Sequence, residues 1–572
     1  MDASTWKWLP SDDQDEIMKL ILKTIKGRWS ILSLVLDGSG WALFVFALSR
    51  FALALSTLAT TLAALPDIVA RTPQRTFYGV RVHDKVDAYL GIPYAKPPLG
   101  DLRFRPPQPL DIGDEHTIVN ATQFGPVCYQ FRYKTVLGDN LAPTTPESED
   151  CLSLNIFTPL GRPKSKLLPV LVWLYGGAFN EGGSSVPLFN PTGLVANHAD
   201  IIVVTLNYRL NVFGFPNSPA IPIDQQNLGI RDQRAALEWL RENLAAFGGD
   251  PTRITLGGQS AGADSAALLT YAFKDDPIVQ GLILQSGIPE YVGPQDDFVF
   301  IQTAETVGCR NAANRTNELS CMKSVPALIL HRALSNLTVN PFGTTGGAPM
   351  IDNITLYSVE EYGRLGSAGS FARVPVLMGI TNNEGDGVLN WSEKGVNKTL
   401  SDILTTTYFN CPMSQEAFFR TKHQVPVWRY RYMGVFPTVT FSSWLGSYHQ
   451  ADIALALGSY RHLKPHKKPQ WYEVAASDYL QKAWAAFIKA PTDGLSRNMG
   501  WPMYNPNGMV PMLCHLGLKP CRYAENHPLG TTLVELFANN TPTGRLREPA
   551  EFDAICSHPP PIPSDIWSQG PP

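Results

Sequence analysis

The stretch "ITLGGQSAGADSAALL", Ile254 to Leu269, constrains the fold more than any other part of this chain. An apolar, β-rich run leads directly into Ser260, which stands between two glycines at the spacing G-x-S-x-G. The small and apolar residues that follow favour a helix. Glycines on both sides permit a strained strand-to-helix turn and close packing of the two elements, so the pattern predicts a turn that exposes the serine hydroxyl.

The segments before this turn alternate between strand and helix patterns. Uninterrupted apolar runs at 167–175 and 200–208 are typical of buried strands in a parallel sheet. The segment 232–247 carries apolar residues at helical spacing. They are Ala235, Leu237, Leu240 and Leu244. Strand and helix in alternation predict an α/β fold with a mostly parallel central sheet flanked by helices.

Bulk properties limit the classes of partner and the number of domains. The chain has 572 residues, a formal net charge of -3 and no long run of one sign, which argues against nucleic acid as a partner. No repeat, linker or break in composition divides residues 67–545, so we expect one large catalytic domain there, followed by a proline-rich tail at 546–572. Phosphate-loop and zinc motifs are absent from the sequence, and we expect neither a cofactor nor a metal.

The first 66 residues differ from the rest, because basic residues precede a mostly apolar stretch from Trp29 to Leu65. This order predicts a secretory leader, with a retained signal anchor or a mis-started reading frame as alternatives. Contact with a membrane is expected only through this segment. Eight cysteines and seven N-x-[S/T] sequons also favour the secretory route. The predicted glycosylation sites are Asn120, Asn314, Asn336, Asn353, Asn390, Asn397 and Asn539.

Two longer segments resemble the signatures of the type-B carboxylesterase/lipase family. "FGGDPTRITLGGQSAG", 247–262, is similar to the active-serine signature, and "EDCLSLNIFTP", 149–159, is similar to the second one. With "GIPYAKPPLGDLRF", "LNYRLNVFGF" and "WPMY", the resemblance covers about residues 67–510. It implies an α/β-hydrolase fold with large loop insertions and a fungal-type serine hydrolase of carboxylic esters.

A serine nucleophile needs a histidine to take its proton and a carboxylate to support that histidine. His449, in "LGSYHQADIALALG", lies C-terminal to Ser260 and matches the family's histidine loop. Glu384, in "TNNEGDG", follows the strand-like "VPVLMGI" at the end where α/β sites form. Asp386 is an alternative on the residues alone, and the resemblance selects Glu384. The expected triad, acting through an acyl-enzyme intermediate, is Ser260, Glu384 and His449.

The tetrahedral intermediate of ester hydrolysis requires backbone N–H donors for its oxyanion. Ala261, the residue after the nucleophile, is one expected donor. By resemblance, the glycine-rich loop "WLYGGAFNEGG" supplies Gly177 and Ala178, while Gly176 permits the turn.

The resemblance also assigns part of the scaffold. It implies disulfides Cys128–Cys151 and Cys309–Cys321, and a structural ion pair between Arg103 and Glu149. The remaining four cysteines allow three pairings, which the sequence leaves open. They are Cys411, Cys514, Cys521 and Cys556.

Substrate class is only partly constrained. Cholinesterases hold choline against an indole in the loop between the first two cysteines, but here that loop has no tryptophan, and Gln259 stands where they have glutamate. Both differences argue against a choline ester. A small-molecule or lipid ester remains, for a carboxylesterase, a lipase or a hydrolase of a specialised ester or lactone. A catalytically silent binding or adhesion module is the alternative, which the complete set of serine, acid and histidine disfavours. The sequence predicts no oligomeric state.

Overall fold

The structure is a computed structural model, and it describes a defined part of the chain. The described residues are 68–113, 117–131, 138–161, 166–289, 296–335, 337, 347–389, 392–505, 533–557 and 560. The expected leader, two sequons and two of the cysteines lie outside them. These are 1–66, Asn336, Asn390, Cys514 and Cys521.

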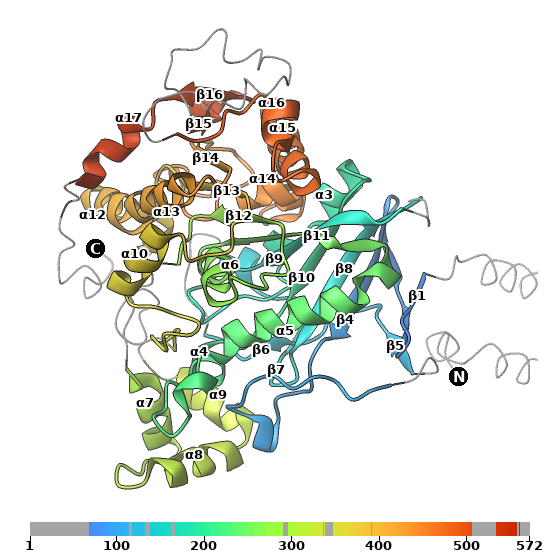
Figure 1. The fold of residues 1–572 in the computed structure, drawn as a ribbon, viewed down its shortest axis with the longest axis vertical. Coiled ribbons are helices and arrows are strands. Elements are labelled where there is room, and N and C mark those ends of the chain that lie inside the picture. The colour runs from blue at the N-terminus through green and yellow to red at the C-terminus, as the bar shows by residue number, and fades with distance from the viewer. Residues whose placement is uncertain are drawn as a thin grey trace, which may run out of the picture. The chain divides into compact units, whose positions relative to one another are not determined.

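An 11-stranded sheet forms the centre of the molecule, in the order β16-β15-β14-β13-β12-β11-β9-β10-β8-β4-β3 (Figure 1). Neighbouring strands from β15 to β10 are parallel, while β16 at one edge and β8, β4 and β3 at the other pair antiparallel. The strands are β3 Val80–His83, β4 Val86–Pro93, β8 Ser153–Pro159, β9 Leu168–Leu174, β10 Ile202–Leu206, β11 Gly249–Gln259, β12 Gly281–Gln285, β13 Val376–Thr381, β14 Val427–Tyr432, β15 Leu533–Leu536 and β16 Gly544–Arg547. The prediction of an α/β fold with a mostly parallel sheet is confirmed.

The central strands are apolar on both faces because helices cover both sides of the sheet. Every residue of β9 and β10 is buried, as the runs at 167–175 and 200–208 predict. Each fully buried Val or Leu in these strands contributes about 1.5–3 kcal/mol relative to exposure. This burial fixes the carboxyl ends of the parallel strands, and the loops that carry the expected site residues begin there.

Two groups of helices surround the sheet. Helices α5 and α6 contact each other and β11, whereas α3, α14 and α15 form a second packed group. The bounds are α3 Thr192–Asn197, α4 Asn211–Gly214, α5 Leu228–Asn243, α6 Ala261–Ala272, α7 Phe298–Thr306, α8 Arg315–Ser324, α9 Ala327–Ser335, α10 Val359–Ala368, α11 Glu384–Val388, α12 Lys398–Leu404, α13 Cys411–Lys422, α14 Ile453–Leu457, α15 Trp471–Lys489, α16 Gly494–Met499 and α17 Ala550–Asp553.

The helix expected at 232–247 begins earlier than its apolar pattern. It spans Leu228–Asn243 and continues as a 3-10 turn to Phe247. Leu237, Leu240 and Leu244 are buried as predicted; Ala235 is partly buried and packs against the core, and Ala236 is the fully buried alanine of this face. Ala236 lies four residues before Leu240, whereas Ala235 lies one position further round the helix.

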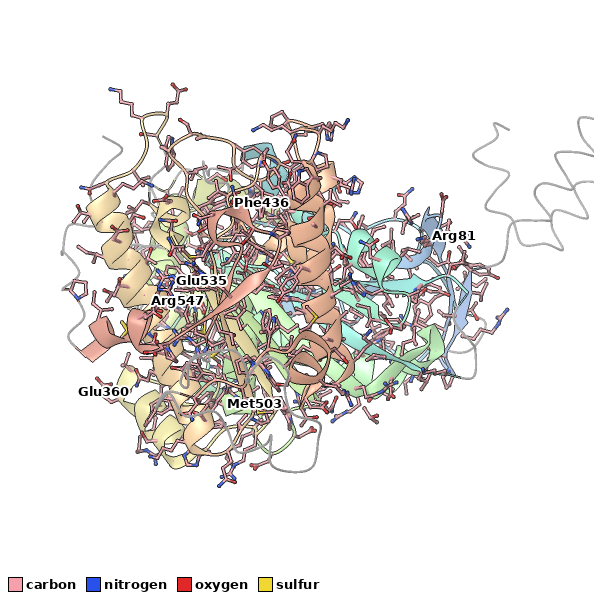
Figure 2. All side chains as sticks on the ribbon, turned by 90° about the horizontal axis from the view of Figure 1, so that it is seen from above. Arg81, Glu360, Phe436, Met503, Glu535 and Arg547 are labelled. Atoms are coloured by element: carbon pink, nitrogen blue, oxygen red, sulfur yellow. A yellow bond between two sulfur atoms is a disulfide. The ribbon has the colours of Figure 1, made fainter. Side chains whose placement is uncertain are left out.

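At the edge of the sheet near the C-terminus, ion pairs join the last two strands and a disulfide links the segment that follows them to α13. Glu535 on β15 pairs with Arg545 and Arg547 on β16, and Figure 2 shows Glu535 and Arg547 on this hairpin. Cys411 pairs with Cys556, one of the pairings that the sequence leaves open. Residues up to Cys556, including the first part of the expected tail, are therefore attached to the domain.

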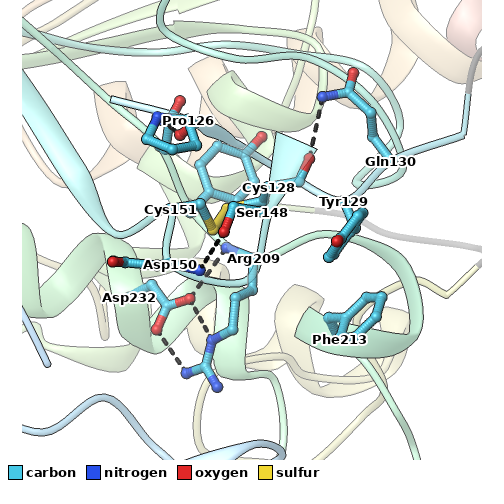
Figure 3. Close-up of a disulfide and its surroundings, with 12 residues drawn as sticks. Pro126, Cys128, Tyr129, Gln130, Ser148, Asp150, Cys151, Arg209, Phe213 and Asp232 are labelled. Carbon is cyan, nitrogen blue, oxygen red and sulfur yellow. Dashed lines mark hydrogen bonds and ion pairs between the residues drawn. A yellow bond between two sulfur atoms is a disulfide. The ribbon is translucent and has the colours of Figure 1, made fainter. Parts of the chain in front are cut away.

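Disulfides and a buried ion pair lie around the loop between β6, Val127–Cys128, and β7, Glu147–Ser148. The structure contains disulfides Cys128–Cys151 and Cys309–Cys321, the pairings that the resemblance implies. Beside the first disulfide, Arg209 forms a buried ion pair with Asp232 at 2.7 Å (Figure 3). The remaining short strands are β1 Val69–Arg71, β2 Thr76–Tyr78 and β5 Ile118–Asn120, which form a small separate sheet.

Surface features bear on the predicted secretory route. Five sequon asparagines are exposed, and glycosylation at them stays a prediction; they are Asn120, Asn314, Asn353, Asn397 and Asn539. Within the part of the chain that the structure describes, no helix combines the length and apolar character needed to cross a bilayer.

Candidate active site

Ser260 lies on a strained turn between β11 and α6. Its backbone has φ 55° and ψ -129°, a conformation that is costly for a residue with a side chain. The turn is held from both sides: the Ser260 N–H donates to Gln285 O at 2.9 Å, and Asp264 N–H donates to Ser260 O at 2.8 Å. The strained backbone conformation places this hydroxyl at the carboxyl end of β11, as in a nucleophile elbow.

Both glycines of G-x-S-x-G are required by close packing. A Cβ on Gly258 would lie 2.4 Å from the Gly262 carbonyl, where strand and helix meet. A Cβ on Gly262 would lie 2.1 Å from Leu174 O on β9. These positions cannot accept a larger residue without separating α6 from the sheet, which explains the spacing seen in the sequence.

The glycine-rich loop after β9 reaches the serine. A Cβ on Gly176 would lie 2.6 Å from Gln259 O and 2.9 Å from the Ser260 Cβ, so no side chain fits between this loop and the turn. Gly177 and Ala178 follow with φ 123° and 51°. In the described part of the chain, the N–H groups of Gly177, Ala178 and Ala261 have no hydrogen-bond acceptor. Three unused donors beside a serine are suited to stabilise an oxyanion.

His449 and Glu384 are brought together by two loops that pair with each other. Asn383 forms a parallel bridge with Tyr448, next to both residues. His449 Nδ1 lies 2.5 Å from Glu384 Oε2, and the Thr381 N–H donates to Glu384 Oε1 at 2.7 Å. Both side chains are buried. Because a carboxylate only accepts hydrogen bonds, Nδ1 carries the hydrogen and Nε2 is left as an acceptor.

Asp386, the alternative acid, faces other partners. Its carboxylate binds Lys398 Nζ and accepts from Ser401 Oγ at 2.7 Å and from Gly446 N–H at 3.2 Å. The structure therefore brings Glu384, and not Asp386, to the histidine.

The free side of His449 contacts Gln259 rather than Ser260. Gln259 Nε2 lies 2.9 Å from His449 Nε2, while the Ser260 hydroxyl has no hydrogen bond in the described part of the chain. Gln259 Oε1 is buried and has no hydrogen-bond partner within the part of the chain that the structure describes. The histidine is thus held at the elbow by the residue next to the serine, and in an unliganded site the final serine–histidine bond often forms only with substrate.

A second buried carboxyl, Asp452, lies three residues after His449 in the "HQADIAL" segment. It is not among the site residues that the sequence predicts. It accepts from Gln285 Nε2 at 2.7 Å and from Tyr430 OH at 3.0 Å. Desolvation by burial raises the pKa of Asp452 to about 6, with a further contribution from the charge of Glu384. The H-x-x-D spacing after the histidine was the signal available.

Another carboxyl lies one helical turn after the serine. Asp264 Oδ1 accepts from the Ile288 N–H at 2.8 Å, and burial raises its pKa well above the ordinary value.

Among the described residues, no group of three His, Cys, Asp or Glu side chains is placed to hold a metal. The chemistry that this arrangement supports is nucleophilic attack by serine with proton transfer through histidine.

Comparisons with known proteins agree with this geometry. The model of the carboxylesterase family matches residues 68–396 and 389–529. A chlorogenic acid esterase of Aspergillus niger is 35% identical over 74% of this chain and 82% of its own length. Secreted lipase 5 of Gibberella zeae is 32% identical, over 81% of this chain and 88% of its own. An acetylcholinesterase of Bungarus fasciatus is 29% identical, over 76% and 80%.

Proposed function

This chain belongs to the carboxylesterase family and is a carboxylic ester hydrolase, and we propose that Ser260, His449 and Glu384 are its catalytic triad. The observation that carries the proposal is the chain of contacts from the buried Glu384 through His449 to the strained elbow. No other described carboxylate contacts His449, and Ser260 lies between the histidine-bound Gln259 and the unused N–H of Ala261.

The reaction begins when the Ser260 hydroxyl replaces the Gln259 amide at His449 Nε2. The hydroxyl loses its proton to Nε2 as its oxygen bonds to the ester carbonyl carbon, and Glu384 stabilises the imidazolium that forms. The carbonyl oxygen becomes an oxyanion that accepts from Gly177, Ala178 and Ala261.

Collapse of this intermediate breaks the bond to the alcohol oxygen, which receives the proton from His449. A water molecule then attacks the acyl-enzyme and gives its proton to the same nitrogen. The acid departs and Ser260 regains its proton, so the enzyme returns unchanged.

The substrate we propose is an uncharged or phenolic carboxylic ester rather than a choline ester. Gln259, in contact with His449, brings no negative charge to the site, and the loop between Cys128 and Cys151 has no indole to hold a quaternary ammonium. The named fungal relatives act in this range, as a chlorogenic acid esterase and a secreted lipase. The second relative is secreted, and we propose the same route for this chain, with its disulfides formed there.

Hydrolysis of a graded series of p-nitrophenyl esters, with a chlorogenic ester and a choline ester added, tests the proposal. We expect turnover of the first two types, with the choline ester slowest. Ser260→Ala should lower kcat by roughly 10⁴-fold or more while the protein stays folded. Ser265→Ala, a buried serine on the same helix, is the matched control. Full turnover by Ser260→Ala would refute the assigned nucleophile.

A further inference from the structure

An exposed basic segment leads into α15 and ends at the first residue of that helix. We define the basic loop as residues 461–471, "RHLKPHKKPQW". It carries four permanent cations and two histidines but no carboxylate, in a chain whose formal net charge is -3. All six side chains are exposed, and in the described part of the chain none of them forms an ion pair. They are Arg461, His462, Lys464, His466, Lys467 and Lys468.

The loop ends in an exposed indole. The side chain of Trp471 is 75% exposed, and its only described aromatic contact is an edge contact with Tyr472 at 5.9 Å between ring centroids. An indole left in water forfeits the burial that a tryptophan ordinarily gains in a folded protein. Cations alone would attract any anion, whereas cations with a projecting indole fit a surface that is anionic outside and apolar just beneath.

The loop is firmly held in this exposed position. Lys464 N–H donates to Asn140 Oδ1, and Asn140 Nδ2 donates to Lys464 O, both at 2.6 Å. Leu463 is buried, and Pro465 and Pro469 stiffen the backbone between the lysines. The backbone that carries the cations is therefore held in place, so that less backbone freedom is lost when they bind.

The contacts of the loop also join it to two other segments of the domain. Asn140 belongs to the segment between Cys128 and Cys151, and Lys467 Nζ donates to Thr440 O at 3.3 Å on the segment that leads to His449. The Lys467 ammonium also lies 5.8 Å from the centroid of the Phe441 ring. A surface bound by the loop would thus lie next to the segment that carries Asn140 and to the segment that precedes His449 in the chain.

From these observations we propose that the basic loop docks this enzyme on an anionic phospholipid surface. The lysines and Arg461 would lie against the headgroup phosphates, and Trp471 would enter the boundary with the acyl chains. The proposal concerns binding and does not depend on the assigned triad, because binding is measured without turnover.

Sedimentation with vesicles tests the proposal on the full chain. Vesicles of phosphatidylcholine alone are compared with equal mixtures of phosphatidylcholine and phosphatidylglycerol, at low and at high salt. We expect binding to the anionic vesicles, weakened by salt through screening. Substitution of Lys464, Lys467 and Lys468 by Gln should lower this binding about 100-fold, at about fivefold for each cation.

Matched variants separate the loop from net charge and exposure. Lys274→Gln, Lys482→Gln and Lys489→Gln together remove the same charge from lysines that pair with Asp275, Asp478 and Asp200, and should leave binding nearly unchanged. Trp471→Ala should weaken binding, while Ile112→Ala, at an 88% exposed site, should not. Turnover of a soluble ester reports that every variant is folded.

Three results would overturn the proposal. The first is wild-type protein that fails to bind anionic vesicles at low salt, and the second is undiminished binding by the triple Gln variant of the loop. The third is retention on immobilised polygalacturonate without vesicle binding, which would assign the loop to an acidic polysaccharide instead.

Discussion

The region around Ser260 and the region around Arg103 both bury polar and charged groups, but they treat them in opposite ways. Arg103 uses every guanidinium nitrogen: it binds both oxygens of Glu149 at 2.6 and 2.7 Å and donates to three carbonyls of residues 322–325. Near Ser260, by contrast, Gln259 Oε1 and three backbone N–H groups have no hydrogen-bond partner among the described residues, and the serine backbone is strained.

This difference separates stability from function. A fully paired buried charge resists removal and holds two segments together, here the Cys128–Cys151 loop and α8. Unpaired donors and strain cost folding energy and persist where a ligand or a transition state will use them. Substitutions in the first region should therefore change stability, and those in the second should change turnover.

The largest expected effect tests this contrast within one loop. Glu384→Gln should lower kcat by roughly 10⁴-fold, because the neutral amide can no longer support the imidazolium. Asp386→Asn, two residues away, should keep kcat within about tenfold, since Asp386 contacts Lys398 and Ser401 instead. Steady-state kinetics on a soluble ester measure both, and the reverse order of effects would show that the acid has been misassigned.

Arg103→Ala should change stability and not chemistry. Removing the guanidinium leaves Glu149 buried without a partner, which costs about 3–5 kcal/mol of unfolding free energy. Arg364→Ala is the control: its pair with Glu361 is exposed to solvent, and its loss should change the unfolding free energy far less. Urea unfolding gives both values. Equal losses in the two variants, or a selective loss of kcat in folded Arg103→Ala, would break the comparison.

Asp452 is buried and hydrogen-bonded to neutral side chains, with no cation beside it among the described residues. Its contribution to the stability of the fold therefore depends on pH. Its pKa is raised to about 6 in the folded state by burial, so the folded protein binds this proton more tightly than the unfolded chain. Its contribution to stability is therefore present below about pH 4 and is lost as pH rises through about 6, by roughly 3 kcal/mol at most.

Asp452→Asn should remove this dependence. The stability of the wild type relative to the variant should fall between pH 4 and pH 7 and then stay constant, as measured by the thermal midpoint of each. A difference that is constant with pH, or that grows as pH rises, would contradict the raised pKa.

Much of the fold could be predicted from the sequence because its determinants are local. Continuous apolar runs identify strands buried on both faces, as for β9 and β10, and the glycines around Ser260 identify the turn between β11 and α6. The pairing of Cys411 with Cys556 could not be predicted, because the two cysteines are 145 residues apart and only the folding of the whole domain brings them together.

Some features of the site also follow from local sequence, whereas others depend on contacts between distant segments. Glu384 and Asp386 look equivalent in sequence, but residues two apart on a helix point about 200° away from each other, so only one of them can face the histidine. From the sequence, Gln259 is notable only because it stands in place of a glutamate. Its contact with His449 joins the end of β11 to a loop 190 residues away. Long-range contacts of this kind leave no pattern in the chain.

Covalent labelling with a fluorophosphonate, followed by mass spectrometry of the labelled peptide, tests the central claim most directly. The predicted result is one adduct on Ser260 in the wild type, none in Ser260→Ala, and strongly slowed labelling in His449→Ala. Folded wild-type protein that does not label, or a Ser260→Ala variant that labels as fast as the wild type, would contradict the assignment of Ser260 as the activated nucleophile.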